Sequence, residues 1–367
     1  MKISVVKDDL TKGLQIVQNV VGARSTLPIL SNVLLIAGDK KLELRATDLE
    51  VSIHATLPAN IEKEGATTLP AKRMFGLIRE IEAGEVEIEV NDKEIATVQG
   101  GAAKYKLHGI GADEYPQQAK FKESGKIKMS QAKFREMLRK TSFAVSTDES
   151  RHVLNGIHVV METERITLVA TDGRRLALVE EEVEGGTKGE IIVPNKAVGE
   201  MQRLMQGEGE IEIGIGETHA QFKMPQDGGE AVKLHSKLVE GNYPNYKQVI
   251  PAESQQRITL AKEELHHALR RADQITSDKA NSVKLKFSDN NLTITANTPE
   301  IGSGFESIAI KYDGPEIEVA FNPTYLMDPL KVLEGDEIFL EITDSLSPGV
   351  IKSNTPFLYV IMPMRTN

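Results

Sequence analysis

A strand that ends in a Thr-Asp turn is repeated along this chain of 367 residues, and any fold must accommodate the repetition. Residues 166–178 read ITLVATDGRRLAL, with apolar and polar positions alternating as in a strand that buries one face. The same pattern begins 124 positions earlier, in residues 42–53 (LELRATDLEVSI), and a more divergent copy occupies residues 292–301 (LTITANTPEI). Three such copies at wide spacing predict three similar domains.

Each copy is preceded by a short strand and a segment with the apolar spacing of a one-sided helix. These segments begin near Ile3, Ile127 and Ile258. Apolar residues four positions apart lie on one helix face, so each segment is expected to bury one side. The corresponding pairs are Leu10 and Leu14, Phe134 and Leu138, and Leu265 and Leu269.

A second strand and helix follow each turn. The predicted helices lie in residues 69–81, 193–205 and 321–333, and short alternating strands such as GEVEIEV come after them. Pro323 suits a first helical turn, whereas Pro329 falls within the helical pattern and should shorten or kink that helix. Each repeat therefore contains two rounds of strand, helix and antiparallel strands.

The repeat boundaries are marked by Tyr-Pro phrases. Tyr115-Pro116 and Tyr243-Pro244 are 128 positions apart, and a polar stretch typical of a linker follows each. We expect domains at residues 1–120, 121–252 and 253–367. Alternating strands indicate antiparallel sheets with one solvated face and helices on the other, an α+β fold class.

Composition excludes several classes of site. Without Cys, the chain can form no disulfide, thiolate zinc site, iron–sulfur cluster or Cys nucleophile. The N-terminus has no signal-peptide core, and no apolar run approaches the ~18 residues of a membrane span, so a cytoplasmic protein is expected. The net charge of −10 argues against coating of nucleic acid, but it describes the average surface and not one face.

Positive charge is concentrated on the predicted helices, which together carry +4. The most basic is residues 131–142, where Phe134, Met137, Leu138 and Thr141 form a buried stripe. The opposite half is predicted to hold Lys133, Arg135, Arg139 and Lys140. An ordinary solvated helix face accounts for this pattern when it is considered alone; contact with phosphates is the alternative interpretation.

Four phrases then match a known family in register with the repeat. They are LPILSNVLL at residues 27–35, ATDGRRLAL at 170–178, EGNYPNY at 240–246 and VIMPMR at 360–365. The chain resembles, along its whole length, the bacterial DNA sliding clamps, the beta subunits of the DNA polymerase III holoenzyme.

The resemblance implies a processivity factor for DNA replication. It implies three copies of the clamp fold per chain and a head-to-tail homodimer that closes into a ring around double-stranded DNA without reading sequence. Helices would line the hole and sheets would form the outer wall. The implied partners are a clamp loader, the replicative polymerase, and other clamp-binding polymerases and repair proteins. No cofactor, metal or catalytic residue is implied, and a head-to-tail interface that closes by symmetry gives a ring and not a filament.

The resemblance also implies DNA contacts from basic residues on the helices and neighbouring loops. The loop at residues 145–156 ends in LNG, and just before LNG, where family members often carry aromatic residues, this chain has His152 and Val153. A plain surface loop is the alternative for this segment. The implied DNA-contact residues are Arg24, Lys72, Arg73, Lys133, Arg135, Arg139, Lys140, His152, Lys196 and Arg203.

A hydrophobic cleft for short partner peptides is the second implied surface. It would combine the ATDG turn, the second Tyr-Pro phrase, part of the third repeat and the C-terminal tail. Its implied residues are Leu154, Thr171, Gly173, Arg174, Arg175, Leu176, Pro244, Val249, Asn322, Tyr325, Leu346, Val360, Ile361, Met362, Pro363, Met364 and Arg365.

The residue types agree with such a surface. Met362 and Met364 would point to one face of a terminal strand, and thioethers suit a site that accepts related peptides. Gly173 permits close approach of a peptide backbone, and Tyr325 can anchor it. Taken alone, the tail reads as a packed strand. Asp48 and Asp172 are interpreted as turn residues that accept backbone N–H groups.

Two other functions compete with this interpretation. An enzyme is disfavoured because no nucleophile elbow, metalloprotease motif or phosphate loop occurs in the required context, and the eight His are scattered. A tandem-domain scaffold that never touches DNA remains an alternative, and the charge on the helices is the feature that distinguishes it from a clamp.

Overall fold

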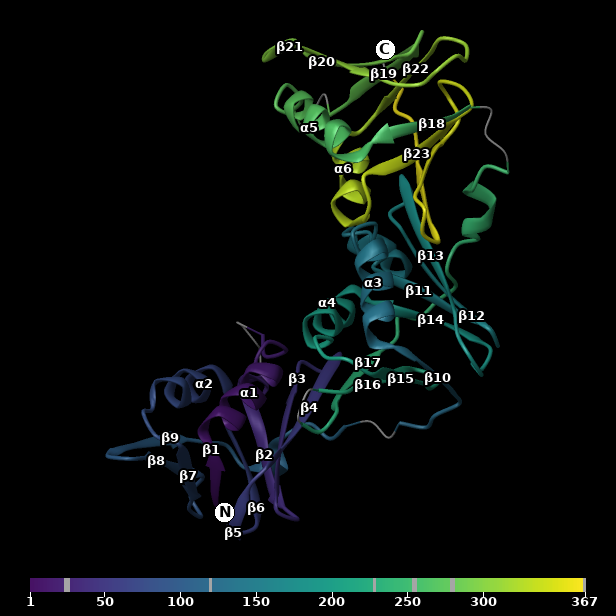
Figure 1. Cartoon of the computed structure of the whole chain (residues 1–367). Coiled ribbons are helices and arrows are strands. Elements are labelled where there is room, and N and C mark those ends of the chain that lie inside the picture. Colours follow the sequence, from purple (N-terminus) through teal and green to yellow (C-terminus); the bar gives the residue numbers. More distant parts are fainter. Residues whose placement is uncertain (23–26, 119–120, 227–228, 253–255, 278–280, 366–367) are drawn as a thin grey trace. The chain divides into compact units, whose positions relative to one another are not determined.

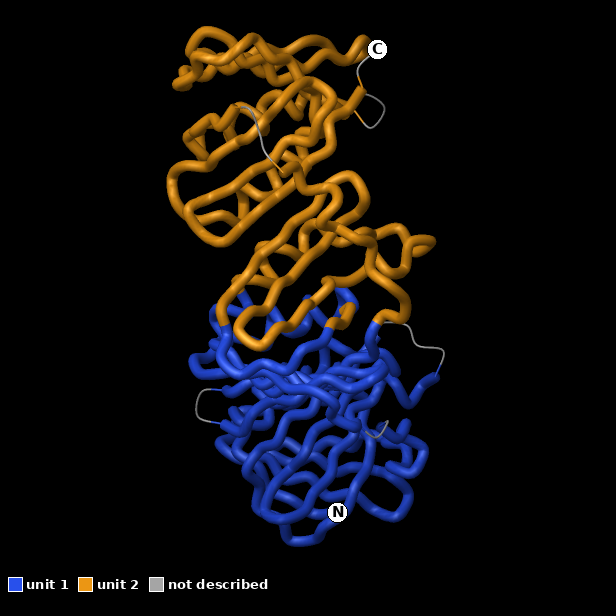
Figure 2. The backbone as a smooth tube through the Cα atoms, turned by 90° about the vertical axis from the view of Figure 1, so that its right-hand side faces the viewer, with its two compact units in different colours: residues 1–135, 183–189, 193–238 blue, residues 136–182, 190–192, 239–367 orange. Residues whose placement is uncertain are grey.

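The computed structural model describes residues 1–22, 27–118, 121–226, 229–252, 256–277 and 281–365. The chain divides into two compact units, shown in blue and orange in Figure 2. Unit 1 comprises residues 1–135, 183–189 and 193–238, and unit 2 comprises residues 136–182, 190–192 and 239–367. Residues of the middle repeat therefore occur in both units.

Unit 1 is built on an eight-stranded and a five-stranded sheet (Figure 1). Its strands are β1 (Lys2–Val6), β2 (Asn32–Gly38), β3 (Lys41–Thr47), β4 (Val51–Pro58), β5 (Asn60–Lys63), β6 (Gly65–Pro70), β7 (Glu85–Val90), β8 (Ile95–Gly100), β9 (Ala103–His108), β10 (Gly125–Ser130), β15 (Glu210–Ile215), β16 (His219–Met224) and β17 (Val232–Lys237). The sheet orders are β10-β15-β16-β17-β4-β3-β2-β6 and β5-β1-β7-β8-β9.

Unit 2 has the same plan, with an eight-stranded and a four-stranded sheet. Its strands are β11 (Gly156–Met161), β12 (Arg165–Thr171), β13 (Arg175–Glu182), β14 (Gly189–Pro194, which has residues in both units), β18 (Gln256–Ala261), β19 (Val283–Ser288), β20 (Asn291–Thr298), β21 (Gly302–Ala309), β22 (Ile317–Phe321), β23 (Glu337–Ile342), β24 (Gly349–Lys352) and β25 (Phe357–Ile361). The sheet orders are β14-β11-β12-β13-β25-β24-β23-β18 and β21-β20-β19-β22.

The large sheets cross the repeat boundaries. In unit 1, β4 of the first repeat pairs with β17 of the second, with His54 opposite Lys233. In unit 2, β13 of the second repeat pairs with β25 of the third, with Leu176 opposite Val360. Both pairings are antiparallel, as the alternating sequence predicted. A backbone hydrogen-bond ladder therefore joins successive repeats.

The helices pack on these sheets with one apolar face each. In Figure 1, α1 lies beside α2 and α5 beside α6. Each of the six segments predicted to be helical contains a helix, and no helix in the described part of the chain is long and apolar enough to cross a membrane. The helices are α1 (Lys7–Val17), α2 (Ala71–Glu80), α3 (Gln131–Ser142), α4 (Asn195–Leu204), α5 (Lys262–Asp273) and α6 (Pro323–Val332), with short 3-10 helices η1 (Pro28–Ser31), η2 (Ala112–Glu114), η3 (Glu149–Leu154) and η4 (Tyr246–Val249).

The predicted apolar pairs of the repeated helix are confirmed as core residues. Each of the six side chains is at most 3% exposed. In α1 the neighbouring Gly13 is also buried. A Cβ at this position would lie only 2.8 Å from a methyl carbon of Leu57 on β4. The i, i+4 spacing thus identified the buried face, and the helix approaches the sheet closely where a glycine permits it.

Helix α6 contains Pro329 and is continuous through it, ending at Val332. A proline has no N–H, so Pro329 leaves the carbonyl of Tyr325, four residues earlier, without its helical donor. The buried Tyr359 of β25 supplies one, since its hydroxyl donates to that carbonyl at 2.8 Å. The strand therefore replaces a hydrogen bond that the helix cannot make.

Candidate peptide site and nucleic-acid interface

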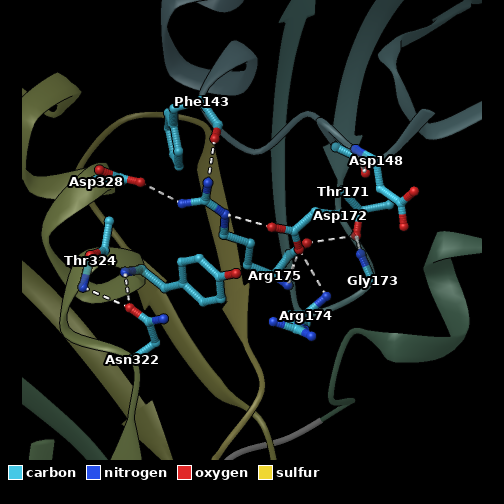
Figure 3. A network of polar contacts seen from close by, with 12 residues as sticks. Phe143, Asp148, Thr171, Asp172, Gly173, Arg174, Arg175, Asn322, Thr324 and Asp328 are labelled. Carbon is cyan, nitrogen blue, oxygen red and sulfur yellow. Dashed lines mark hydrogen bonds and ion pairs between the residues drawn. The ribbon is translucent and has the colours of Figure 1, made fainter. Parts of the chain in front are cut away.

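The turn between β12 and β13 is fixed by side chains of its own sequence (Figure 3). Asp172 Oδ1 accepts the backbone N–H groups of Arg174 (2.9 Å) and Arg175 (3.1 Å), as predicted for an Asp in a turn. The Thr171 hydroxyl donates to the carbonyl of Arg175 at 2.6 Å and accepts the N–H of Gly173 at 3.0 Å. Gly173 has a φ of 83°, a conformation that favours glycine.

Arg175 is the centre of a buried polar network that links this turn to α6. Its guanidinium pairs with Asp172 at 3.1 Å and Asp328 at 2.5 Å, and donates to the carbonyl of Phe143 at 2.6 Å. The guanidinium carbon also lies 4.4 Å from the ring centre of Tyr325. Burial alone would lower the pKa of Arg175, but the Tyr359 hydroxyl and the two carboxylates outweigh it and raise that pKa.

Arg175, predicted as a peptide-site residue, is extensively engaged within the protein. Its side chain is only 10% exposed and its donors are occupied within the protein. Arg175 positions the turn against α6, while the neighbouring Arg174 is exposed. Asn322 is similarly engaged, because its Oδ1 caps α6 by accepting the N–H groups of Thr324 at 2.9 Å and Tyr325 at 3.3 Å (Figure 3).

An apolar surface lies beside this turn. Its buried floor consists of Val169, Leu176 and Val360, which pack together, and five partly buried residues pack against them. We call this set of eight residues the unit 2 patch; the other members are Leu178, Tyr243, Tyr246, Ile250 and Leu358. Leu176 and Val360 were predicted from the sequence, whereas the other six were missed.

The missed residues had recognisable signals. Val169 and Leu178 face each other across β12 and β13, and Leu178 faces Leu358 across β13 and β25. They occupy alternate strand positions on the same sheet face as Leu176. The two tyrosines belong to the NYPNY phrase, of which the predicted site included only Pro244.

Four other predicted peptide-site residues of unit 2 have exposed apolar side chains. Met362 is 41% exposed, Met364 39%, Val249 46% and Leu346 76%. The tail is not a continuation of β25, which ends at Ile361, so the prediction that a terminal strand aims both methionines to one face is wrong. The backbone instead makes separate bonds, from Met362 N–H to the Arg174 carbonyl at 2.9 Å and from Met364 N–H to the Ala320 carbonyl at 2.7 Å.

The remaining predicted peptide-site residues differ in exposure. Leu154 and Ile361 are buried, Thr171, Tyr325 and Pro363 are half-buried, and Pro244 and Arg365 are exposed. All of them belong to unit 2.

The loop at residues 145–156 contains η3 and packs on the turn. Asp148 caps η3 by accepting the N–H of Ser150 at 3.0 Å, and it pairs with Arg151 at 3.0 Å. Arg151 also donates to the carbonyl of Asp172 at 2.9 Å, which places its guanidinium over Gly173. Leu154 is buried beneath η3 and His152 is exposed. The loop is therefore an ordered part of the turn's surroundings.

Comparison with known proteins supports the family indicated by the motifs. Family models of the DNA polymerase III beta subunit match the N-terminal domain at residues 1–119, the central domain at residues 128–245 and the C-terminal domain at residues 247–365. The chain belongs to the beta sliding clamp family. It is therefore a processivity clamp of DNA replication with three clamp domains of antiparallel sheets and helices.

Individual relatives agree over their full length. The beta sliding clamp of Chlamydia muridarum is 34% identical over 367 residues, which cover 100% of this chain and 99% of the relative, and that of Bacillus subtilis is 31% identical with 100% coverage of both. The DnaN sliding clamp of Bartonella birtlesii bound to griselimycin has a TM-score of 0.94 and 33% identity, with both chains fully covered. The beta subunit of Pseudomonas aeruginosa has a TM-score of 0.95 and 29% identity, again with full coverage.

The clamp's predicted DNA-contact residues fall into two groups. Lys72 and Arg73 on α2 and Lys133 and Arg135 on α3 are exposed, as is His152 on η3. Within the described residues, Lys72, Arg73 and Arg135 make no ion pair. Arg24 lies outside the described residues.

The second group is engaged in internal contacts. Lys140 was predicted on the exposed half of α3, and this is wrong: it is buried, pairs with Glu136 at 3.2 Å and donates to the Thr355 hydroxyl at 3.3 Å. Arg139 is half-buried and bonds both oxygens of Glu136, at 2.8 and 2.7 Å. Burial would raise the pKa of Glu136, but these two cations lower it.

Two residues of α4 are also engaged. Arg203 pairs with Glu200 at 2.7 Å and donates to the carbonyls of Ile16 at 2.7 Å and Gln15 at 3.3 Å. These carbonyls belong to the last turn of α1, where a helix has no internal donors, so Arg203 stabilises that helix end. Lys196 is exposed and pairs with Asp48.

Proposed function

We propose that this clamp works as a head-to-tail homodimeric ring around duplex DNA and that the unit 2 patch receives short peptides from its partners. The partners would be the replicative polymerase, a clamp loader, other polymerases and repair proteins. The observation that carries the proposal is the fixed turn at Asp172 beside an apolar surface with exposed methionines and leucine. The three domains at residues 1–120, 121–252 and 253–367 would form half of the ring.

Peptide binding at the patch has physical support. Val169, Leu176 and Val360 give a floor of low polarity, and burying apolar side chains against it contributes ~25 cal/mol per Å². Met362 and Met364 are exposed and flexible enough to fit related sequences. The Arg175 network keeps the adjacent turn rigid, which lowers the entropy cost of binding. The griselimycin complex of the Bartonella birtlesii clamp supports a ligand-accepting surface in this family.

Ring closure is supported by two open sheet edges. Strand β9 ends the five-stranded sheet of unit 1 and carries exposed Tyr105, Lys104 and Lys106. Strand β21 ends the four-stranded sheet of unit 2 and carries Phe305, which is 69% exposed, and Glu306. Open edges invite pairing with another strand. Each edge presents an exposed aromatic residue, Tyr105 or Phe305, to a partner strand, while Glu306 is paired with Arg271 of its own chain at 2.7 Å.

Contact with DNA would be electrostatic and independent of sequence. Lys72 and Arg73 of α2 and Lys133 and Arg135 of α3 are exposed cations that suit phosphate contacts. A ring holds DNA by linkage, so these contacts can be weak enough for sliding. We expect no catalysis by the clamp itself and a location with the replication machinery in the cytoplasm.

The decisive experiment tests linkage. The protein would be loaded on nicked circular plasmid with a clamp loader, passed through gel filtration, and examined again after one cut in the plasmid. Retention on the circle and loss from the linear form support the ring. Equal retention on both would indicate ordinary electrostatic binding, and retention on neither, with a loader active on a known clamp, would favour a DNA-free scaffold.

The peptide site is tested by a double variant, Leu176→Ala with Met364→Ala. Fluorescence anisotropy with a labelled clamp-binding peptide should show at least about tenfold weaker binding, because both apolar contacts are lost. Val6→Ala is the matched control, since Val6 is an exposed apolar residue of unit 1. Unchanged peptide affinity in the double variant, with the dimer intact by sedimentation, would refute the assignment of the patch.

A further inference from the structure

We infer that unit 1 carries a second ligand site, a hollow suited to an acidic peptide segment of a partner protein. The hollow has a volume of about 630 Å³, within the range of ligand pockets. We call it the unit 1 hollow; the residues that define it here are Arg45, His54, Tyr115, His219, His235 and Lys237. The inference does not depend on the peptide site proposed for unit 2.

The unit 1 hollow occupies the place in its repeat that the unit 2 patch occupies in the next. It lies at the Thr-Asp turn between β3 and β4, beside the Tyr115-Pro116 phrase and the end of β17. The unit 2 patch lies at the Thr-Asp turn between β12 and β13, beside Tyr243 and β25. The same elements therefore form both surfaces.

The side chains at equivalent ladder positions have opposite chemistry. Across β3, β4 and β17 the row reads Arg45, His54 and Lys233. Across β12, β13 and β25 the corresponding row is Val169, Leu178 and Leu358. The next row pairs Ser52 with His235 in unit 1 and Leu176 with Val360 in unit 2. An apolar ligand suits the second surface, and a ligand with hydrogen-bonding and anionic groups suits the first.

The charge of the hollow favours an anion. Lys237 lines the hollow, and Lys233 lies on the same strand, β17. Both lysines are exposed, and neither has an ion pair within the described residues. Arg45 also lines the hollow and is held by a bidentate pair with Glu43 at 2.7 and 2.8 Å. Glu43 therefore neutralises Arg45, Glu50 is the carboxylate in the lining, and Lys237 and Lys233 are the cations that remain to attract an anion.

The walls of the hollow are planar and fixed. The rings of His54 and His235 have centres 5.1 Å apart, and Phe121 meets His235 edge-on at 6.3 Å. The Tyr115 hydroxyl donates to the Arg45 carbonyl at 3.2 Å, which holds the ring against the sheet. Such walls accept the flat or aliphatic part of a side chain while Lys237 contacts a carboxylate of the ligand.

A short acidic peptide fits these features better than a nucleic acid strand. A polyanionic backbone needs a row of unpaired cations. Further along the same sheet, Lys126 and Lys223 both pair with Glu212, at 2.7 and 2.6 Å, and Lys128 lies 3.7 Å from it. Those cations are already neutralised, so the attraction is local to the hollow and matches a few carboxylates.

The test uses the full-length clamp and a fluorescein-labelled hexapeptide, Glu-Asp-Phe-Glu-Leu-Asp, with Lys-Lys-Phe-Lys-Leu-Lys as the basic control. Anisotropy should show binding of the acidic peptide only, and Lys237→Glu should weaken it at least about tenfold. Lys247→Glu, at an exposed lysine of unit 2, is the matched control and should change affinity less than about twofold.

Three results would overturn the inference. One is equal affinity in Lys237→Glu and the unaltered clamp. Another is loss of the acidic peptide in the Leu176→Ala, Met364→Ala double variant, which would place it on the unit 2 patch. A third is binding of labelled oligo(dT) with the same dependence on Lys237, which would indicate a general polyanion site. If Lys237→Glu alters the thermal unfolding curve, Lys237→Met serves in its place with the same criteria.

Discussion

The two Thr-Asp turns of units 1 and 2 have the same backbone but different surroundings. Asp48 accepts the N–H groups of Glu50 at 3.0 Å and Val51 at 2.8 Å, as Asp172 does two and three residues ahead of it. The residue after each Asp has a positive φ, 78° for Leu49 and 83° for Gly173. The local sequence Thr-Asp is therefore sufficient to set the turn, with or without glycine.

The difference lies in the residue three positions after each Asp. In unit 1 it is Val51, which is fully buried in the core. In unit 2 it is Arg175, whose guanidinium connects the turn to α6 of the third repeat. The turn thus contacts the next repeat in both units, through the pair of Asp48 with the exposed Lys196 in unit 1 and through the buried pair of Arg175 with Asp328 in unit 2. The surfaces next to the turns diverge in the same way, polar in one unit and apolar in the other.

Removing the Arg175 guanidinium should have the largest effect. Arg175→Met removes the positive charge that pairs with Asp172 and Asp328, and the side chains of these two residues are only 14% and 16% exposed. We expect unit 2 to lose about 3 kcal/mol of unfolding free energy, because breaking a buried ion pair strands its partners. Urea denaturation measures this loss. Arg174→Met, at an exposed neighbour, should change stability by less than about 0.5 kcal/mol, and equal effects of the two variants would contradict this role of Arg175.

The buried histidine of the unit 1 surface should make the stability of that unit depend on pH. Burial, followed by the nearby His54, Lys233 and Arg45, lowers the pKa of His235 to about 3. Below a pH of ~6.5, the ordinary pKa of histidine, the unfolded chain binds a proton at His235 that the folded chain does not bind. The free energy of unfolding therefore falls as the pH drops from 6.5 towards 3.

His235→Gln removes this contribution and isolates it. Between pH 7 and 4.5 the unaltered clamp should lose about 2 kcal/mol more unfolding free energy than the variant does. Denaturant titrations of both proteins at the two pH values measure the difference. Parallel pH profiles would mean that His235 keeps its ordinary pKa in the folded state. His219→Gln, a change at a histidine near the rim, serves as the control.

Adding a side chain at Gly173 should have a smaller effect. Gly173→Ala places a Cβ at a φ of 83° and 3.1 Å from the Arg151 guanidinium. The expected loss is about 1 kcal/mol from the backbone, since the arginine end can shift. Thermal or urea unfolding measures it, with Gly199→Ala as a control at a helical glycine with open space around it. A loss no greater than that of the control would show that the turn tolerates Cβ atoms.

The reverse substitution in unit 1 should have the smallest effect. Leu49→Gly relieves a left-handed conformation of a residue with a Cβ, but glycine also adds freedom to the unfolded chain. The two contributions nearly cancel, and we expect a change within about 0.5 kcal/mol of zero. A gain of more than about 1 kcal/mol in urea denaturation would show that the turn of unit 1 is strained.

The periodic part of the structure was accessible from the sequence. The buried faces of the repeated helices, the Asp turns and the alternating strands each depend on neighbours a few residues away. Lys140 shows where this reasoning ends: helical spacing placed it on the exposed half of α3, but Thr355 of the third repeat and Glu136 enclose it. No local sequence pattern predicts a hydrogen-bond partner 215 positions away.

Only part of the candidate site could be predicted from the sequence, because local patterns do not show which strands pair. The ATDG turn and the tail were recognised as phrases, whereas Val169, Leu178 and Leu358 become neighbours only through strand register. The matching phrases show Arg45 at the position of Val169, but only strand register places Arg45 in one row with His54 and Lys233. Register and cross-strand identity must be known before the two surfaces can be told apart.

The ladder that joins β4 to β17 and β13 to β25 has a consequence for cutting the chain. An isolated middle repeat would lose both neighbours, so β17 and β13 would each become a bare edge. Unpaired edges of that length aggregate readily. In the intact chain, amide protons at these junctions should exchange with solvent as slowly as those of interior strands. Successive repeats thus share one sheet, so a single repeat is not an exchangeable module.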